Sequence, residues 1–359
     1  YDRSFTSMIP HGARQRAFLI PANNFKGALP EGGIRELRAI TIFGIDRNDL
    51  TGTLPDGGIG AMSAVRLFVA GSNSMTGTLS DSIKEMRTLS NFYIYENTFS
   101  GVFPESGMTA MASVANFIID TNGFEGVILT GSRTLSSVSS FSVPYNLLTG
   151  ALPGDGIVSM LSLTFFRIDS NRYTGTLPDA GLRAMGAVTD FVLKTNSFRG
   201  ALPDSGLRAM RVMTDFLIDY NSFRGSLPES SIGAMGTVKY FEAPHNILSG
   251  MFPDIGAMSA LITFSIWDNY FTGKLPERGI GAMSAVQNFL VNRNRFTGAL
   301  SDDSMRAMKV ATFFRVDENW LKGTLADMRA MSTLFVLALH GNSFRGTLPD
   351  SLPLLTVLV

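Results

Sequence analysis

The sequence predicts an α/β repeat solenoid, in which about fourteen short units stack on one another and share one hydrophobic core. Three observations lead to this fold class. A phrase of the form G-[TA]-L-P recurs with its glycines 23 to 25 residues apart, an asparagine stands four residues before each glycine, and no linker, charge block or shift in composition interrupts the series. We therefore expect a single array over residues 1–359, with 1–11 as a partial N-terminal repeat or cap remnant and 351–359 as an incomplete C-terminal repeat.

The asparagines mark the point where each unit turns inward. A carboxamide side chain both donates and accepts hydrogen bonds, so it can satisfy backbone groups that a buried turn removes from water. Repetition of the residue predicts a ladder of such bonds along the array. Its members are Asn23, Asn48, Asn73, Asn97, Asn122, Asn146, Asn171, Asn196, Asn221, Asn246, Asn269, Asn294, Asn319 and Asn342.

Two columns of large apolar residues accompany the asparagines. Phe stands five residues before the asparagine in thirteen repeats, and Leu337 takes its place in the other one. The residue two before each glycine is also large and apolar, and in eight repeats it is Phe. The two columns hold 21 of the 27 Phe residues. Runs such as 216–218 are too short for a helical period and predict one short strand per unit, with alternate side chains directed inward.

A methionine column precedes the strand. Met lies eleven residues before the asparagine in eleven repeats, and Leu37 and Leu135 fill the same position in two others. A stripe of thioethers could hold a soft metal, but one apolar residue per repeat is what a core column requires, and Leu replaces it twice. We expect these side chains in the core.

The glycine and the proline that follow the asparagine are expected to shape the chain before a short helical turn begins. Glycine permits a backbone conformation or a close approach that a side chain would block, and the following Pro suits an extended segment without backbone hydrogen bonds. Segments such as 205–210 are then expected to form short helical turns.

The unit resembles a leucine-rich repeat, L-x-x-L-x-L-x-x-N-x-L, with Phe at the second apolar position. Its tail, seen at 223–228 as F-R-G-S-L-P, resembles the class found in plant receptors and kinetoplastid surface antigens. The G-T-L-P wording followed by a Met-centred segment, as at 175–185, is most similar to the promastigote surface antigen and proteophosphoglycan type, although the cysteine-containing caps and the convex Trp of that type are missing.

This resemblance covers roughly residues 12–350. It implies a horseshoe or arc with a parallel β-sheet on the concave face and short helical or 3-10 segments on the convex face. It also implies an extracellular or cell-surface location.

Composition excludes several classes of function. The chain has no Cys and three His, which removes disulfide staples, thiolate zinc sites and cysteine nucleophiles and leaves little imidazole chemistry. Thirty basic and thirty acidic residues leave no broad electrostatic footprint for nucleic acid or an anionic membrane. No apolar run approaches the length of a transmembrane helix. We expect no cofactor, no metal and no nucleic-acid partner.

Partner binding is expected on the strand residues that face away from the core. These stand six, four and two positions before each asparagine, with the residue just before the asparagine at their edge. The main candidates are Tyr220, Tyr240, Glu242, His245, Trp267 and Asp268, because interface hot spots favour aromatic side chains with a polar rim. Tyr93 and Tyr95 form a smaller second cluster. The alternative is that these aromatic residues only pack across the sheet.

Catalysis is not expected. His245 near Asp268 or Glu242 would suit acid–base chemistry, but the repeat places no serine or paired carboxylate to complete such a site. Aspartates stand two before the asparagine at positions 46, 120, 169, 219 and 317. They never occur in adjacent repeats, so we expect solvated strand carboxylates and no calcium cage.

The sequence therefore favours a non-enzymatic extracellular or cell-surface protein that recognises a protein or glycan partner through its concave sheet. The alternative is a structural unit of a coat or filament. In that case copies would associate end to end through uncapped apolar ends such as 351–359, unless those ends are simply truncated.

Overall fold

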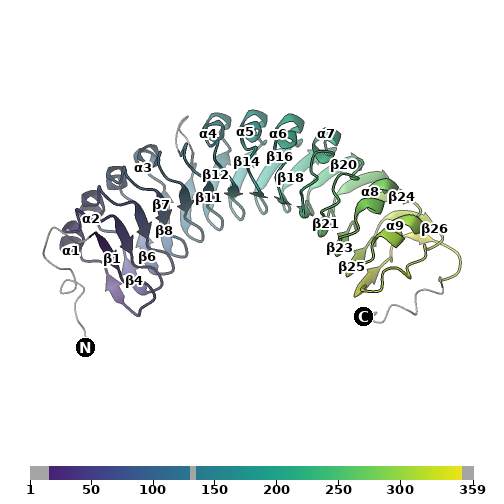
Figure 1. Cartoon of the computed structure of the whole chain (residues 1–359), viewed down its shortest axis with the longest axis horizontal. Coiled ribbons are helices and arrows are strands. Elements are labelled where there is room, and N and C mark those ends of the chain that lie inside the picture. The colour runs from purple at the N-terminus through teal and green to yellow at the C-terminus, as the bar shows by residue number, and fades with distance from the viewer. Residues whose placement is uncertain (1–15, 130–134, 350–359) are drawn as a thin grey trace. The chain divides into compact units, whose positions relative to one another are not determined.

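The computed structural model describes residues 16–129 and 135–349, so the expected terminal pieces 1–11 and 351–359 lie outside the described residues. The chain divides into two compact units, Tyr1–Thr174 and Gly175–Val359. Within each unit every repeat contributes one strand to each of two parallel sheets, and most repeats also contribute a short helix (Figure 1). The organisation of the whole chain as a single array remains a prediction.

The first sheet is formed by the predicted strands, which start six residues before each asparagine. Equivalent residues of neighbouring repeats pair directly, so that Phe18 lies beside Phe43 and Phe216 beside Phe241. In the unit 16–174 its strands are β1 (Ala17–Leu19), β3 (Ile42–Gly44), β5 (Leu67–Val69), β7 (Asn91–Tyr93), β9 (Asn116–Ile118), β11 (Ser140–Ser142) and β13 (Phe165–Arg167). In the unit 175–349 they are β15 (Asp190–Val192), β17 (Asp215–Leu217), β19 (Tyr240–Glu242), β21 (Thr263–Ser265), β23 (Asn288–Leu290), β25 (Phe313–Arg315) and β27 (Val336–Ala338).

The register of the first sheet stacks the Phe column into the core. Ring centroids of successive Phe side chains are 5.0 Å apart for Phe43 and Phe68, and 5.3 Å apart for Phe289 and Phe314. These rings are fully buried, and so is the Met column. The core positions expected for Phe and Met are confirmed.

A second parallel sheet runs through the segment that follows each asparagine. The sequence did not predict this sheet. The proline segment that we expected to be extended lies beyond the second-sheet strands, as at Pro228 after β18 (Ser222–Gly225). In the unit 16–174 its strands are β2 (Lys26–Ala28), β4 (Asp49–Gly52), β6 (Ser74–Gly77), β8 (Thr98–Val102), β10 (Gly123–Gly126), β12 (Leu147–Ala151) and β14 (Arg172–Gly175). In the unit 175–349 they are β16 (Ser197–Gly200), β18 (Ser222–Gly225), β20 (Ile247–Met251), β22 (Tyr270–Lys274), β24 (Arg295–Gly298), β26 (Trp320–Gly323) and β28 (Ser343–Phe344).

The second sheet is staggered with respect to the repeat. Lys26 pairs with Asp49 and Gly27 with Leu50, whereas the repeat makes Gly27 equivalent to Gly52. Each strand is thus shifted by two residues against its neighbour. The stagger places the side chain that follows one repeat glycine over the glycine of the next repeat.

That close approach, together with a left-handed backbone, explains the glycine column. Gly77 has φ +82°, and a Cβ added there would lie 2.6 Å from Cγ2 of Thr53. Gly298 has φ +86°, and its Cβ would lie 3.0 Å from Cγ of Lys274. A residue with a side chain would therefore meet both backbone strain and a steric clash at these positions.

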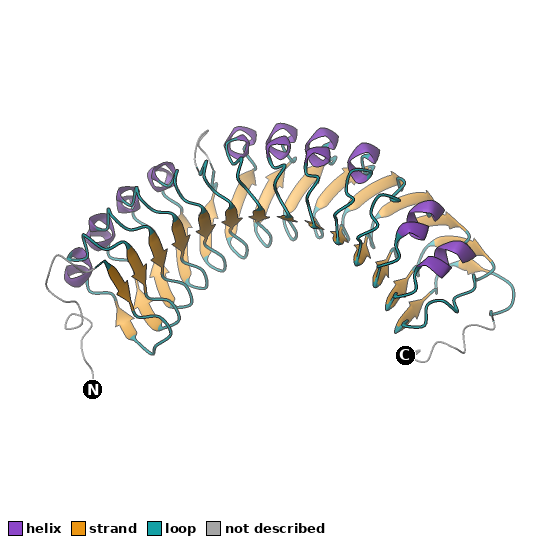
Figure 2. Ribbon diagram, viewed as in Figure 1, coloured by secondary structure: helices purple, strands orange, loops and turns teal. Residues whose placement is uncertain are grey.

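Short helices follow the second-sheet strands and lie on the side of each unit opposite the first sheet (Figure 2). Most begin after a proline and carry an acidic residue in the first turn, where the helix dipole favours negative charge. They are α1 (Glu31–Arg35), α2 (Asp56–Ala61), the 3-10 helix η2 (Asp81–Glu85), α3 (Glu105–Ala110), α4 (Gly154–Val158), α5 (Asp179–Ala184), α6 (Asp204–Ala209), α7 (Glu229–Ile232), α8 (Glu277–Ala282) and α9 (Asp302–Ala307). The helical turn expected at 205–210 is confirmed as α6.

Over the residues that the structure describes, none of the helices has the length and apolarity needed to cross a bilayer.

Candidate functional site

The asparagines connect each repeat to the one before it. Nδ2 of Asn246 donates to the carbonyl oxygens of Ala243 and Pro244 in its own repeat and of Ile218 in the preceding repeat, at 3.1–3.3 Å. Its Oδ1 accepts a hydrogen bond from the backbone N–H of Phe223 at 3.0 Å. Asn246, Asn269 and Asn294 are all buried. Side chains next to this column are therefore held on a fixed backbone.

The residue immediately before each asparagine adopts a left-handed backbone conformation. In five successive repeats φ is +51° at Tyr220, +50° at His245, +56° at Asp268, +52° at Arg293 and +52° at Glu318. Because the conformation repeats, these side chains emerge at equivalent places along the unit. We call these five residues the turn row.

Members of the turn row contact one another. The Tyr220 and His245 rings have centroids 4.2 Å apart, and the Trp267 ring meets His245 edge-on at 4.0 Å. Nδ1 of His245 lies 2.5 Å from Oδ2 of Asp268. Nε of Arg293 lies 3.1 Å from Oε2 of Glu318. The row thus runs from an aromatic end, through the His245–Asp268 contact, to the Arg293–Glu318 ion pair.

A second row is formed by the residues that directly follow the asparagines, Ile247, Tyr270, Arg295 and Trp320, which we call the stacking row. Cζ of Arg295 lies 4.7 Å from the centre of the Tyr270 ring and 6.0 Å from that of Trp320. The guanidinium therefore interacts with two aromatic faces. Tyr270 is 45% exposed and Trp320 58% exposed.

The two rows border a groove of about 480 Å³. Four turn-row residues, all but Tyr220, and three stacking-row residues, all but Trp320, line it. Asn221, Asn246, Asn269 and Asn294 contribute to its lining. One side of the groove thus carries Ile247, Tyr270 and Arg295, and the other side carries His245, Asp268, Arg293 and Glu318.

The predicted main cluster is only partly brought together. His245 and Asp268 line the groove, and Tyr220 and Trp267 contact the His245 ring. Tyr240 and Glu242 lie on strand β19 and are not among the groove residues. Burial raises the pKa of the Glu242 carboxyl, and the nearby Asp219 carboxylate raises it further.

Sequence reasoning missed Arg293, Glu318 and the whole stacking row. Two signals were present in the repeat alignment. The column before the asparagine reads His, Asp, Arg, Glu in four successive repeats, and the column after it reads Ile, Tyr, Arg, Trp. The column after the asparagine lies beyond the strand positions that were searched for a binding face. The column before it was searched only as the edge of that face, where Tyr220, His245 and Asp268 were singled out.

In the other unit Tyr93 and Tyr95 lie two residues apart near the end of strand β7. The Tyr95 ring covers Gly71 of the preceding repeat, where an added Cβ would lie 2.6 Å from a ring atom. Burial, followed by the neighbouring Tyr95, raises the pKa of the Tyr93 hydroxyl. Tyr95 therefore packs across the sheet, and a role for this pair in binding stays a prediction.

Metal ligation can be tested on one cluster. Among the described residues, Asp317, Glu318 and His340 bring possible ligand atoms within 4.8 Å of one another. Both oxygens of the buried Asp317 already accept from the Arg315 guanidinium at 2.9 and 3.1 Å. Because Glu318 also pairs with Arg293, a cation would compete with two guanidinium groups, and the cluster is better described as an ion-pair network.

The aspartate column is less exposed than expected. Asp169, Asp219 and Asp317 are buried, so the prediction of solvated carboxylates is wrong for these three. Their side chains lie near the start of the inward turn and not on an open face. Burial of a carboxylate requires compensation by hydrogen bonds or cations, as Arg315 provides for Asp317.

Paired parallel sheets, an asparagine hydrogen-bonded to backbone carbonyls at each inward turn and a repeat of 23–25 residues define a leucine-rich-repeat solenoid. No family model and no curated protein sequence matches the chain. Solved structures do. The PEPR1–AtPEP1 structure has a TM-score of 0.88 at 23% identity, over 96% of this chain and 47% of that chain.

Two further structures agree with this fold. The Arabidopsis receptor kinase HAESA in complex with the peptide hormone IDA and the co-receptor SERK1 has a TM-score of 0.77 at 22% identity, over 96% of this chain and 65% of that one. A leucine-rich-repeat protein of Leptospira interrogans has a TM-score of 0.70 at 20% identity, over 91% and 78% of the two chains. This chain thus spans about half to two thirds of the first two structures. Similarity at this level establishes the fold.

Proposed function

We propose that this chain is a non-enzymatic recognition protein that binds an extended peptide segment of a protein partner along the groove between the turn row and the stacking row. The observation that carries the proposal is the groove itself, with aromatic faces and an Arg on one side and alternating charges on the other. Its backbone is fixed by the asparagine bonds, so little ordering is needed when a ligand binds.

The chemistry of the groove favours a peptide over a uniformly charged ligand. Its lining carries two arginines, Arg293 and Arg295, and two carboxylates, Asp268 and Glu318. Balanced charges favour a partner that presents groups of both charge signs or backbone amides. Tyr270 and Ile247 supply apolar contact. Exposed aromatic and Arg side chains are the residue types that dominate interface energetics.

The structural comparisons support the same class of ligand. HAESA is described in complex with the peptide hormone IDA, and RGFR1, a plant peptide hormone receptor in complex with RGF2, has a TM-score of 0.76 at 20% identity, over 96% of this chain and 62% of that one. An extracellular or cell-surface location and a relation to kinetoplastid surface antigens are part of this proposal. They rest on the resemblance of the repeat.

The test is selection of a displayed random-peptide library on the whole chain, followed by affinity measurements on two double variants. The double variant Tyr270→Ser, Arg295→Ser removes the centre of the stacking row. Other repeats naturally have Ser in the same column, at positions 74, 197, 222 and 343. Leu147→Ser with Arg172→Ser is the matched control, because it changes an apolar residue and an Arg in the same column of successive repeats in the other unit.

We expect the selected peptides to lose at least about tenfold in affinity for the groove variant and to bind the control as they bind the wild type. Equal loss in both variants, or no loss in the groove variant, would reject the groove. Selection of no peptide, with binding of neutral oligosaccharides that the groove variant abolishes, would identify a glycan site instead.

End-to-end assembly into a coat or filament stays a prediction, since it depends on ends that lie outside the described residues. Light scattering decides it independently of the groove. A monodisperse monomer at high concentration excludes the filament.

A further inference from the structure

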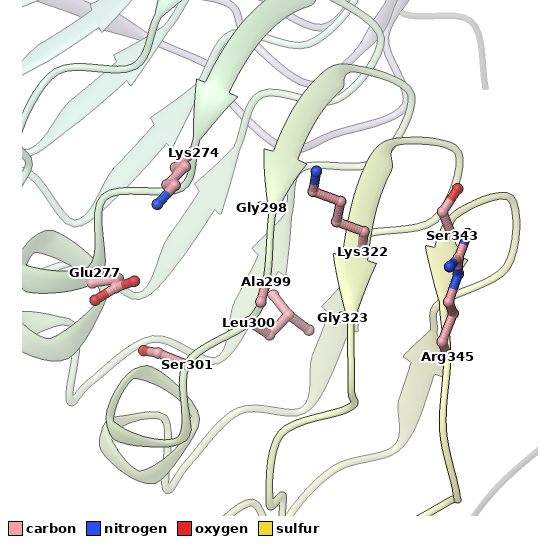
Figure 3. Close-up of a pocket in the computed structure, with 10 residues that line it drawn as sticks. All are labelled: Lys274, Glu277, Gly298, Ala299, Leu300, Ser301, Lys322, Gly323, Ser343 and Arg345. Carbon is pink, nitrogen blue, oxygen red and sulfur yellow. The ribbon is translucent and has the colours of Figure 1, made fainter.

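A second concave site lies at the carboxyl ends of the strands that begin with the stacking-row residues Tyr270, Arg295 and Trp320. It is a trough of about 970 Å³ across strands β22, β24, β26 and β28 (Figure 3). Its basic side chains are Lys274, Lys322 and Arg345. The segment Gly298–Leu300 lies between Lys274 and Lys322, and its glycine leaves the middle of the trough without a side chain.

The positive charge of the trough is uncompensated. Among the described residues, no carboxylate lies within ion-pair distance of Lys274, Lys322 or Arg345, and Glu277 is the single acidic residue of the lining. The chain as a whole has thirty charges of each sign, so this is a local excess and not a general property. Such a concentration of one sign attracts and retains ligands of the opposite sign.

Two of the cations, Lys322 and Arg345, stand on strand β26 and directly after its neighbour β28. Lys322 pairs in register with Ser343, and Arg345 stands two residues further on the same face, which makes it the diagonal neighbour at roughly 7–8 Å. Like charges at this distance repel one another. An oxyanion between them would receive charge-assisted hydrogen bonds from both.

The position of Lys274 is fixed by the fold. Its aliphatic stem packs over Gly298, where an added Cβ would lie 3.0 Å from its Cγ. The stem is thus held against the strand, and the ammonium is placed at the far edge of the trough from Arg345 (Figure 3). Since neighbouring strands are ~4.8 Å apart, the cations on β22 and after β28 are separated by three strand spacings, or ~14 Å.

We propose that this trough binds a polyanionic carbohydrate, one whose sulfate or phosphate esters are spread over a few sugar residues. A single small anion would leave part of a cationic line this long unpaired. A peptide is a poorer fit, because the lining has no aromatic residue and Leu300 is its one large apolar side chain. The hydroxyls of Ser301 and Ser343 are suited to sugar hydroxyls and ester oxygens.

The test uses the whole chain and a short heparin oligosaccharide, with its fully desulfated form as the uncharged probe. The variant Lys322→Thr with Arg345→Thr removes these two neighbouring cations, and Thr is the natural residue in the same column at positions 272 and 297. The matched control is Arg199→Thr with Arg224→Thr, which removes two exposed cations from the same column in successive repeats of the same unit. There the residues after the glycines are Ala201 and Ser226, so no third cation is present.

We expect the trough variant to lose at least about tenfold in affinity for the sulfated oligosaccharide, because two charge contacts are removed, and the control to change by less than about twofold. Lys274→Ala should weaken binding in the same direction. Wild-type affinity should fall with added salt. Thermal melting of each variant shows whether the fold is retained.

Four results would overturn the proposal. The control could lose as much affinity as the trough variant, the desulfated oligosaccharide could bind as tightly as the sulfated one, inorganic sulfate at equal charge could displace the oligosaccharide, or poly-glutamate could bind more tightly. The last result would assign the trough to an acidic peptide. Peptide binding in the groove should be unchanged in the Lys322→Thr and Arg345→Thr variant, which keeps the two proposals separate.

Discussion

Oδ1 of Asn221 accepts a hydrogen bond at 3.0 Å from the backbone N–H of Phe198, a residue of the preceding repeat. Nδ2 of the same asparagine donates to the carbonyl oxygen of Leu193, also in the preceding repeat, at 3.1 Å. One side chain therefore ties together the start of the second sheet and the end of the first sheet. The turn-row and stacking-row residues stand directly before and after these asparagines. Loss of the asparagine hydrogen bonds would therefore also change the geometry of the groove.

Asn221→Ala is expected to lower the free energy of unfolding by ~1–3 kcal/mol, because it leaves the N–H of Phe198 and nearby carbonyls without their partner. Arg224→Ala removes an exposed side chain three residues later and is expected to change stability by less than ~0.5 kcal/mol. Urea denaturation of both variants measures the difference. Equal midpoints would show that the asparagine bonds contribute nothing specific.

Thr195→Gly is expected to stabilise the protein by roughly 0.5–1 kcal/mol. Thr195 precedes Asn196, is exposed and has φ +54°, a conformation that a β-branched residue adopts only at a cost and that glycine adopts freely. Ser197→Gly, two residues away in strand β16, should destabilise because glycine weakens an extended segment. Thermal melting of the two variants measures this. A lower melting temperature for Thr195→Gly than for Ser197→Gly would show that the left-handed conformation of Thr195 is not costly.

The raised pKa of the Asp120 carboxyl predicts that the stability of the protein depends on pH. Burial raises the pKa of its carboxyl from 3.8 to about 6, partly offset by a hydrogen bond from Ser142 and reinforced by Asp169. Between these two values the folded state holds a proton that the unfolded state has released, so the contribution of this group to stability falls as pH rises from about 4 through about 6.

Asp120→Asn removes that charge. The variant should be more stable than the wild type by on the order of 1–2 kcal/mol above pH 7 and nearly equal to it near pH 4. Chemical denaturation at the two pH values measures this. The stability difference between variant and wild type could instead be the same at both pH values, or the variant could be less stable above pH 7. Either result would show that hydrogen bonds or cations stabilise the Asp120 carboxylate more than its surroundings indicate.

Much of the fold follows from the repeat alone. The positions of Phe and Met in the core were predictable because a solenoid reuses the same inward positions in every unit, so fourteen copies average out local ambiguity. The second sheet was not predicted. Its strands contain the repeat glycine, and glycine has a low strand propensity. Its stagger of two residues pairs non-equivalent positions such as Lys26 and Asp49, so an alignment of equivalent positions does not reveal the pairing.

The groove was less predictable than the fold. His245 and Asp268 could be singled out by residue type, but their distance of 2.5 Å depends on the left-handed turn, which the sequence shows only as a variable column. Tyr240 and Glu242 share the composition of a binding site and lie elsewhere, because aromatic and acidic residues recur on the strand for packing reasons as well. Arg295 gains its role from Tyr270 and Trp320, residues of the two adjoining repeats.

The central claim is that the ligand lies between the turn row and the stacking row. The most direct measurement is photo-crosslinking of a library-selected peptide that carries a photoreactive group at each end in turn, followed by mass-spectrometric mapping of the attachment sites on the whole chain. The account predicts crosslinks at Ile247, Tyr270 and Arg295, with the two ends of the peptide marking different repeats of the groove. Crosslinks confined to the helices or to the Lys322 trough would contradict it.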